Sequence, residues 1–207
     1  TVRPDAECGY LAAAAASAIA PSEGNVGAGA GATVGKLAGM NRAMKGGIGT
    51  ASIRRADGLV VGALIAVNAV GDVIDPSTGR VIAGVRTEDG DGLADARALV
   101  RQSAASPSSS NTVIGVVATN AGLSKAQATK VAQMAHDGLA RAISPAHTPR
   151  DGDTIFALAT GQEGVEADVL EIGALAAEAV SEAILRAVRA AEGIPGFPSA
   201  SDLTSSD

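Results

Sequence analysis

The run Asn111-Thr-Val-Ile-Gly-Val-Val-Ala-Thr-Asn120 predicts a buried strand at the centre of the fold. Its apolar residues are mostly β-branched, which is typical of an interior strand. The segment that leads into it, Gln102 to Ser110, is rich in serine and has too little apolar surface to offset its ordering entropy. We therefore expect a mobile tether that ends abruptly at the hydroxyl residue Thr112.

This junction has two interpretations. A tether that meets a rigid strand is often an interdomain linker. It can also be a self-cleavage junction, in which Thr112 is freed as an N-terminal nucleophile. The features of the junction alone leave both interpretations open.

Composition sets the class of protein. A chain of 207 residues suits one domain with a substantial core. The only aromatic residues besides histidine are Tyr10, Phe156 and Phe197, whereas Ala, Gly and Val are abundant, so small side chains must bring helices and sheets close together. A net charge of −6 offers no basic face to neutralise phosphates, and we expect no nucleic-acid partner.

Cysteine content and hydropathy bear on localisation. The single cysteine, Cys8, excludes an internal disulfide and fits a reducing compartment; we expect a cytoplasmic protein and a buried helical thiol. The longest charge-free apolar stretches, Cys8 to Ser22 and Gly58 to Gly71, are too short to span a membrane. Acidic residues precede the first of them, where a signal peptide would need positive charge.

Periodicity and capping signals predict alternating strands and helices. A capping box, Ser124-Lys-Ala-Gln127, opens one of the long helices. We expect helices over residues 4–20, 93–102, 124–143 and 165–191, strands over 47–55, 59–70 and 154–159, a hairpin over 71–84 and a frayed tail over 193–207. This order suggests sheet layers flanked by helices.

The glycine-rich segment from Gly24 to Lys36 departs from nucleotide-binding loops. A phosphate-binding loop needs glycine at position 30 and a hydroxyl residue after the lysine, whereas this chain has Ala30 and Leu37. We expect no cofactor, and glycines that let backbone approach a sheet or a substrate closely. Lys36 is either a solvated charge or a site lysine.

Polar residues at the strand ends are the candidates for chemistry. A carboxamide at the end of a buried strand, as at Asn68, caps a turn or donates to an oxyanion. The pair Asp151 and Asp153 can bind a metal, tighten a turn or orient a proton-carrying group. A calcium loop needs more oxygen ligands at regular spacing, so we expect no metal.

A threonine hydroxyl becomes a nucleophile only when a base removes its proton. A free α-amino group on the same residue can do so because its pKa is near 8, and a nearby aspartate would hold it in place. The combination of Thr112 with Asp151 and Asp153 therefore makes chemical sense only if the Asn111–Thr112 bond breaks.

Several segments together resemble peptidase family S58, which includes the L-aminopeptidase/D-esterase, the β-peptidyl aminopeptidases and the nylon-oligomer hydrolase. The resemblance spans about Ala6 to Arg189. The segments that carry it are Asn111 to Asn120, Ala135-His-Asp-Gly-Leu-Ala-Arg-Ala142, Asp151-Gly-Asp-Thr-Ile-Phe-Ala157, Gly27 to Lys36 and Ala66-Val-Asn68.

The resemblance implies an α/β fold, a four-layer αββα sandwich of the N-terminal-nucleophile-hydrolase type. It also implies a precursor that cuts itself between Asn111 and Thr112, giving fragments 1–111 and 112–207 that stay associated, commonly in homotetramers. By position Thr112 matches the nucleophile and Asn68 the oxyanion donor. Asp151 and Asp153 match the orienting pair, and Lys36 a lysine near the nylon-hydrolase site.

The implied substrates are small peptides, esters or linear oligoamides. A threonine nucleophile with two aspartates resembles the nylon-hydrolase branch. Family precursors carry a further N-terminal portion with a site tyrosine, so the resemblance implies that the single hydrolase domain of residues 1–207 lacks that portion; Tyr10 lies in a predicted helix and does not match. The competing hypotheses are a non-catalytic ligand-binding or scaffold protein of the same fold, with an intact tether, and an ATP-using enzyme.

Overall fold

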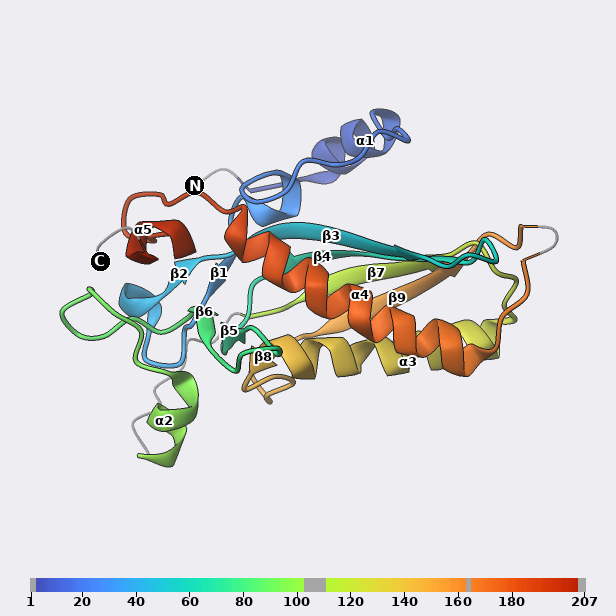
Figure 1. The fold of residues 1–207 in the computed structure, drawn as a ribbon. Helices are drawn as coiled ribbons and strands as arrows, with labels where there is room; N and C mark the ends of the chain where they lie inside the picture. The colour runs from blue at the N-terminus through green and yellow to red at the C-terminus, as the bar shows by residue number, and fades with distance from the viewer. Residues whose placement is uncertain (1–2, 103–110, 163–164, 205–207) are drawn as a thin grey trace.

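A four-stranded sheet forms the centre of the structure, a computed structural model that describes residues 3–102, 111–162 and 165–204 (Figure 1). Its strand order is β3-β4-β7-β9, with antiparallel pairs β3/β4 and β4/β7 and a parallel pair β7/β9. The strands are β3 (Gly47–Arg54), β4 (Val60–Val67), β7 (Ile114–Thr119) and β9 (Thr154–Ala159). The predicted central strand is confirmed as β7, while residues 103–110 of the expected tether lie outside the described residues.

Two long helices cover one face of this sheet, as Figure 1 shows. They are α3 (Lys125–Ala142), which opens with the predicted capping box, and α4 (Val169–Arg189), which opens with a second one between Asp168 and Glu171. The apolar side chains of β4 that point toward the helices are buried, namely Val61, Ala63, Ile65 and Val67. The amphipathic pattern of both helices therefore predicted correctly that they pack as a layer on the sheet.

Small residues let α4 and β3 touch through their backbones. A Cβ atom placed on Gly49 would lie only 2.1 Å from the main-chain oxygen of Ala183, and one on Gly47 only 2.5 Å from that of Ala187. The expectation of a core built from small side chains is thus confirmed at this interface.

Shorter elements gather at the end of the sheet where β4 ends and where β7 and β9 begin (Figure 1). One small sheet has the order β6-β5-β8, and a second pairs β1 with β2. The elements are η1 (Gly27–Gly29), β1 (Thr33–Val34), η2 (Met40–Arg42), β2 (Met44–Lys45), β5 (Asp72–Ile74), β6 (Val81–Ala83), α2 (Ala96–Arg101) and β8 (Ile143–Ser144). They surround the polar strand ends that the sequence singled out.

The face of the central sheet opposite α3 and α4 is apolar and largely open. Four of its large side chains are exposed, namely Leu64, Ile114, Phe156 and Leu158. The described residues thus supply one helix layer and one sheet layer. No helix among them combines the length and apolar composition needed to cross a bilayer.

Two expectations at the ends of the chain are wrong. The first helix, α1 (Ala6–Ala14), is shorter than predicted, stands away from the sheet (Figure 1) and buries none of its residues, so Cys8 is exposed. This segment combines high helix propensity with an N-cap, because Oδ1 of Asp5 accepts from the nitrogen of Cys8 at 3.0 Å. The tail is ordered from 193 to 204 and contains α5 (Ala200–Thr204). The nitrogen of Ser199 donates to Oδ2 of Asp202, and the main-chain nitrogen of Lys45 donates to the oxygen of Pro198.

Candidate functional site

The Asn111–Thr112 peptide bond lies just ahead of β7, between the segment that follows β4 and the segment that precedes β9. The nitrogen of Thr112 donates a hydrogen bond of 3.0 Å to the main-chain oxygen of Asn68, just beyond β4. The oxygen of Asn111 accepts one of 3.0 Å from the nitrogen of Gly152, just ahead of β9. The bond predicted to break is therefore held on both sides.

The hydroxyl of Thr112 lies against that bond. Its Oγ1 donates a hydrogen bond to the carbonyl oxygen of Asn111. A Cβ atom at position 152 would come within 2.8 Å of this Oγ1, so a glycine is required there to leave room for the hydroxyl. The side chain of Thr112 is only half-buried, which leaves it accessible.

The carboxamide of Asn68 has a fixed orientation. Its Oδ1 accepts hydrogen bonds from Lys36 Nζ at 2.7 Å and from the main-chain nitrogen of Thr33 at 3.1 Å. These donors hold the oxygen in place and turn Nδ2 away from them. Within the described residues no hydrogen bond occupies Asn68 Nδ2, so this donor is available to a substrate oxygen.

Lys36 is buried and is not a solvated surface charge. Its Nζ donates to both oxygens of Asn68, at 2.7 Å to Oδ1 and 3.1 Å to the main-chain oxygen. Burial lowers the pKa of Lys36 to about 8, and the charge of Asp151 acts in the opposite direction. The structure thus brings Lys36, Asn68 and Thr112 together.

The two predicted aspartates have different contacts. Asp151 tightens a turn, because its Oδ2 accepts from the hydroxyl of Thr148 at 2.6 Å, and its Oδ1 reaches the nitrogen of Val70 at 3.3 Å. The side chain of Asp153 is buried and accepts from the nitrogen of Val113 at 3.0 Å. Asp153 therefore holds the residue that follows Thr112, whereas Asp151 lies on the Lys36 side.

His147 is a site neighbour that the sequence analysis did not identify. Its Nδ1 lies 3.0 Å from Oδ2 of Asp153, and its ring packs against His136 with 4.9 Å between the ring centroids. Burial and then the charge of His147 lower the pKa of His136. The only signal was the position of His147 in the polar loop that ends at Asp153.

Lys45 was also missed. Its Nζ is fully buried and donates to three main-chain oxygens, those of Gly29 at 2.7 Å, Ala32 at 2.9 Å and Gly46 at 2.8 Å. Burial lowers the pKa of Lys45 to about 8. This side chain fastens the glycine-rich loop beside the site, and its partners 13 and 16 residues away give no local sequence signal.

Two hollows meet at Thr112. A polar one of about 480 Å³ is lined by Asn68, Asn111, Thr112, Pro149, Arg150, Asp151 and Gly152. A smaller one of about 280 Å³ has mostly apolar walls, made by Ala28, Gly31, Ala32, Ala66 and Ile114 together with Asn68 and Thr112. Across the described ranges, no three His, Cys, Asp or Glu residues cluster in a way that could hold a metal ion.

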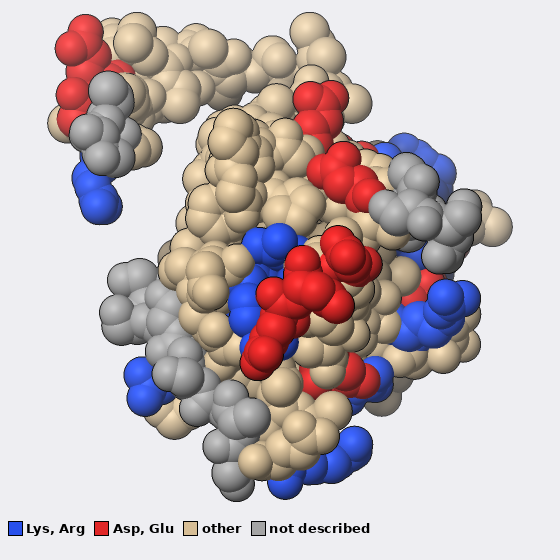
Figure 2. Space-filling model, turned by 90° about the vertical axis from the view of Figure 1, so that its left-hand side faces the viewer, with Lys and Arg blue, Asp and Glu red and all other residues tan. Residues whose placement is uncertain are grey.

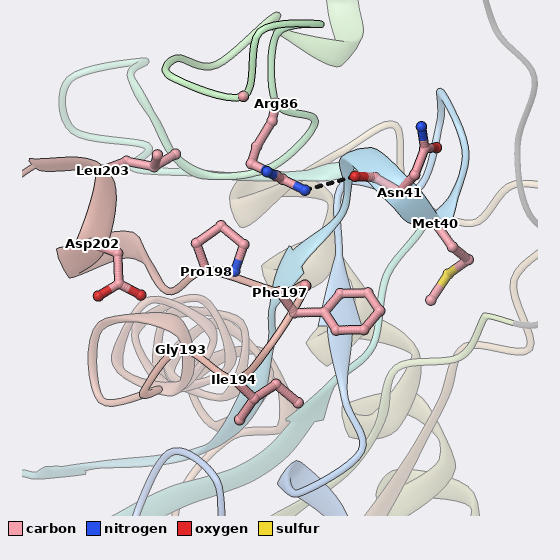
Figure 3. Close-up of a pocket in the computed structure, with 11 residues that line it drawn as sticks. Met40, Asn41, Arg86, Gly193, Ile194, Phe197, Pro198, Asp202 and Leu203 are labelled. Atoms are coloured by element: carbon pink, nitrogen blue, oxygen red, sulfur yellow. Dashed lines mark hydrogen bonds between the residues drawn. The ribbon is translucent and has the colours of Figure 1, made fainter.

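A separate cavity of about 800 Å³ lies between η2 and the C-terminal turn (Figure 3). Met40, Ile194 and Phe197 supply its apolar wall, and Arg86 donates from Nη2 to the main-chain oxygen of Asn41 at 2.6 Å. None of the predicted site residues lines this cavity. Asn68, Asn111, Thr112 and Asp151 instead line the two hollows at Thr112.

The surface at this end of the molecule carries mixed charge. Figure 2 views the end with the short sheets and shows Lys and Arg side chains beside Asp and Glu side chains. Among the described residues, Arg42 and Glu88 form an ion pair with Nη1 and Oε1 3.9 Å apart. The absence of a nucleic-acid partner stays a prediction.

Residues 2–201 match the model of peptidase family S58. The chain belongs to peptidase family S58. This S58 chain is 45% identical over 226 residues to an uncharacterized aminopeptidase of Mycobacterium leprae, with 95% of this chain and 59% of that protein covered. It is 30% identical over 184 residues to the 6-aminohexanoate-oligomer endohydrolase of Kocuria sp., with 81% and 51% covered. The resemblance inferred from the sequence is confirmed.

Solved structures confirm the fold class of this S58 chain. A Burkholderia sp. β-aminopeptidase gives a TM-score of 0.61 at 29% identity, covering 88% of this chain and 50% of that one. The L-aminopeptidase D-Ala-esterase/amidase of Ochrobactrum anthropi, described as a variant of the Ntn hydrolase fold, gives 0.57 at 21% identity, covering 89% and 51%; this likeness concerns the fold alone. The S58 chain spans about half to three fifths of the length of these proteins.

Proposed function

We propose that this S58 chain is a self-processing amide and ester hydrolase in which Thr112 acts as an N-terminal nucleophile after the Asn111–Thr112 bond is cut. The observation that carries the proposal is the setting of this bond. Its nitrogen is held by Asn68, its oxygen by Gly152, and the Thr112 hydroxyl lies against its carbonyl.

Maturation begins when Oγ1 of Thr112 attacks the carbonyl carbon of Asn111. A new C–O bond forms, the C–N bond breaks, and the hydroxyl proton ends on the departing nitrogen of Thr112. The product is an ester between Asn111 and the Thr112 side chain. Water then hydrolyses this ester to give the carboxylate of Asn111 and a free Thr112.

In turnover the freed amine of Thr112 accepts the proton of its own hydroxyl, and Oγ1 attacks the substrate carbonyl. Lys36 favours this role because its ammonium group and the Thr112 nitrogen share the main-chain oxygen of Asn68. A neighbouring positive charge disfavours a second one on the amine. Asn68 Nδ2 then stabilises the oxyanion, the leaving group departs with a proton, and water releases the acyl group.

The two aspartates act on the main chain and on the charge next to the nucleophile. Asp153 holds the nitrogen of Val113 and therefore the start of β7, and Asp151 places a negative charge near Lys36. Both act as positioning residues in this proposal.

The two fragments would stay associated because they share one sheet. β7 pairs along its length with β4, which belongs to fragment 1–111, and with β9, which belongs to fragment 112–207. We further propose a homo-oligomer, and the likeness of this chain to family S58 makes a tetramer the expected form.

The proposed substrates are small peptides, esters or linear oligoamides, the classes suggested by the names of the aminopeptidase and oligomer-hydrolase relatives. The polar hollow suits an amide or ester group, and the apolar one suits an aliphatic segment.

Hydrolysis assays on the complete gene product test the proposal. Wild type, Thr112→Ser and Thr112→Val are each assayed for hydrolysis of four substrate classes: L-aminoacyl p-nitroanilides, β-aminoacyl p-nitroanilides, D-alanine esters and 6-aminohexanoate oligomers. We expect at least one class to be hydrolysed by wild type and Thr112→Ser, and none by Thr112→Val. Equal turnover by Thr112→Val would overturn the proposal, because that variant keeps the shape and lacks the nucleophile.

A further inference from the structure

The contact between Gly152 and Asn111 belongs to a regular series of hydrogen bonds. In the parallel pair β7/β9, residue 114 faces 154, and the same offset places Asn111 opposite Asp151. Two main-chain nitrogens at the start of β9 and just ahead of it donate in the same way. The nitrogen of Thr154 donates to the oxygen of Val113 at 2.9 Å, and that of Gly152 to the oxygen of Asn111 at 3.0 Å. Only the second of these bonds ends on the carbonyl that the proposed maturation attacks.

We infer that the main-chain N–H of Gly152 is the oxyanion donor of the maturation step, and that Asn68 Nδ2 serves the later turnover of substrates. This inference rests on the proposed self-cleavage. As Oγ1 of Thr112 adds to the carbonyl carbon of Asn111, the carbonyl oxygen gains negative charge. A donor already placed at 3.0 Å by the sheet stabilises that charge without reorganisation.

The atoms of this step balance without any further reactant. The Oγ1–C bond forms, the carbonyl π electrons move to the oxygen, and they return as the C–N bond breaks. The hydroxyl proton passes to the Thr112 nitrogen. The N–H of Gly152 keeps its own proton and stays bonded to the oxygen throughout.

Asn68 is engaged differently at this stage. Its main-chain oxygen holds the Thr112 nitrogen, and its Oδ1 is held by Lys36 and Thr33. Its contact with the Asn111–Thr112 bond is thus on the nitrogen side, opposite the carbonyl oxygen. Two donors therefore serve two stages, one on the main chain and one on a side chain.

Glycine is required at position 152 for space. Gly152 is not among the residues with positive φ, so its backbone is open to other residues. A Cβ atom would instead lie 2.8 Å from Oγ1 and 3.7 Å from Cγ2 of Thr112. Glycine lets the N–H approach the carbonyl without displacing the hydroxyl that attacks it.

The direct test removes this one N–H. The Asp151–Gly152 amide of the complete gene product is replaced by an ester, with glycolic acid in place of Gly152. The matched control replaces Thr154 by its α-hydroxy analogue, which deletes the neighbouring N–H that binds Val113. The rate at which the fragment beginning at Thr112 appears is followed by mass spectrometry.

We expect the ester at 152 to slow maturation about 100-fold and the control ester to slow it less than about 3-fold. Equal maturation rates for the two esters would overturn the inference while leaving self-cleavage intact. An unmodified chain that never cuts itself would overturn the self-cleavage proposal and this inference with it.

A second pair of variants separates the N–H from the space that glycine provides. Gly152→Ala keeps the N–H but places its Cβ 2.8 Å from Oγ1 of Thr112. A serine side chain is less restricted at χ1 than threonine, so its hydroxyl can turn away from that Cβ, and the added change Thr112→Ser should restore part of the maturation rate. The same Thr112→Ser change should not restore the ester at 152. Equal rescue of both would overturn the assignment of the N–H.

Discussion

The main-chain oxygen of Asn68 lies 3.0 Å from the main-chain nitrogen of Thr112 and accepts its hydrogen bond. The same oxygen accepts from Lys36 Nζ at 3.1 Å. In the proposed mechanism this nitrogen changes from a peptide N–H to an amine that must stay unprotonated to act as a base. The nearby ammonium of Lys36 favours the unprotonated form.

Replacing Lys36 by methionine should lower kcat about 100-fold. The change removes the 2.7 Å donor that orients the Asn68 carboxamide, and it removes the charge that keeps the Thr112 amine neutral. We therefore expect the acid limb of the kcat/KM profile between pH 5 and 10 to move to higher pH. Lys130→Met on the exposed surface of α3 is the control. A Lys36→Met profile that overlays wild type would contradict the assigned role.

Replacing Lys45 by methionine should lower the free energy of unfolding by about 1–3 kcal/mol. The variant leaves the oxygens of Gly29, Ala32 and Gly46 without their common donor. Urea unfolding measures the loss. Hydrogen exchange of residues 27–32 should also accelerate, and unchanged protection of that loop would show that Lys45 does not fasten it.

Asp72 should make stability fall as the pH rises from about 4 to 6. The carboxylate is fully buried and accepts from the nitrogens of Val85 at 2.8 Å and Ala96 at 2.6 Å, yet burial raises its pKa from 3.8 to about 6. Between these values the folded protein binds more protons than the unfolded chain. Asp72 therefore contributes about 3 kcal/mol to the free energy of unfolding below pH 4, and this contribution is lost as the pH rises through 6.

The difference in unfolding free energy between wild type and Asp72→Asn isolates this effect from that of other carboxylates. We expect the difference to fall across that interval. Parallel stability curves from pH 4 to 7 would show that Asp72 titrates at its ordinary value.

Gly49→Ala should destabilise the protein by about 1–3 kcal/mol, because its Cβ would meet the main chain of α4 at 2.1 Å. Gly62→Ala on the opposite face of the sheet is the matched control, since its Cβ has ordinary contacts of 3.5 Å or more. Thermal unfolding compares the two. A control variant as unstable as Gly49→Ala would mean that strand glycines matter here for their conformation rather than for close packing.

The sequence predicted best where the signal was local. The capping box at Ser124, the apolar run around Val117 and the apolar run of residues 59–67 each lie within a few residues, and they formed one helix and two strands as expected. Strand-end polar residues were also informative, because β4, β7 and β9 meet at one edge of a sheet and bring Asn68, Thr112 and Asp151 together.

Contacts between distant segments escaped prediction. The partners of Lys45 and the pairing of His147 with Asp153 depend on how loops fold over the sheet. The alanine-rich α1 carries high helix propensity but no stripe that distinguishes a buried face, so the exposure of Cys8 could not be foreseen. The order in the tail also depends on a distant contact, because the main-chain nitrogen of Lys45 in β2 donates to the oxygen of Pro198.

Intact-mass measurement of the purified protein tests self-cleavage most directly. We expect two polypeptides that separate between Asn111 and Thr112 and whose masses together exceed that of the precursor by one water molecule. We also expect the Thr112→Ala variant to stay whole. A wild-type protein that remains one continuous polypeptide after long incubation would contradict the account.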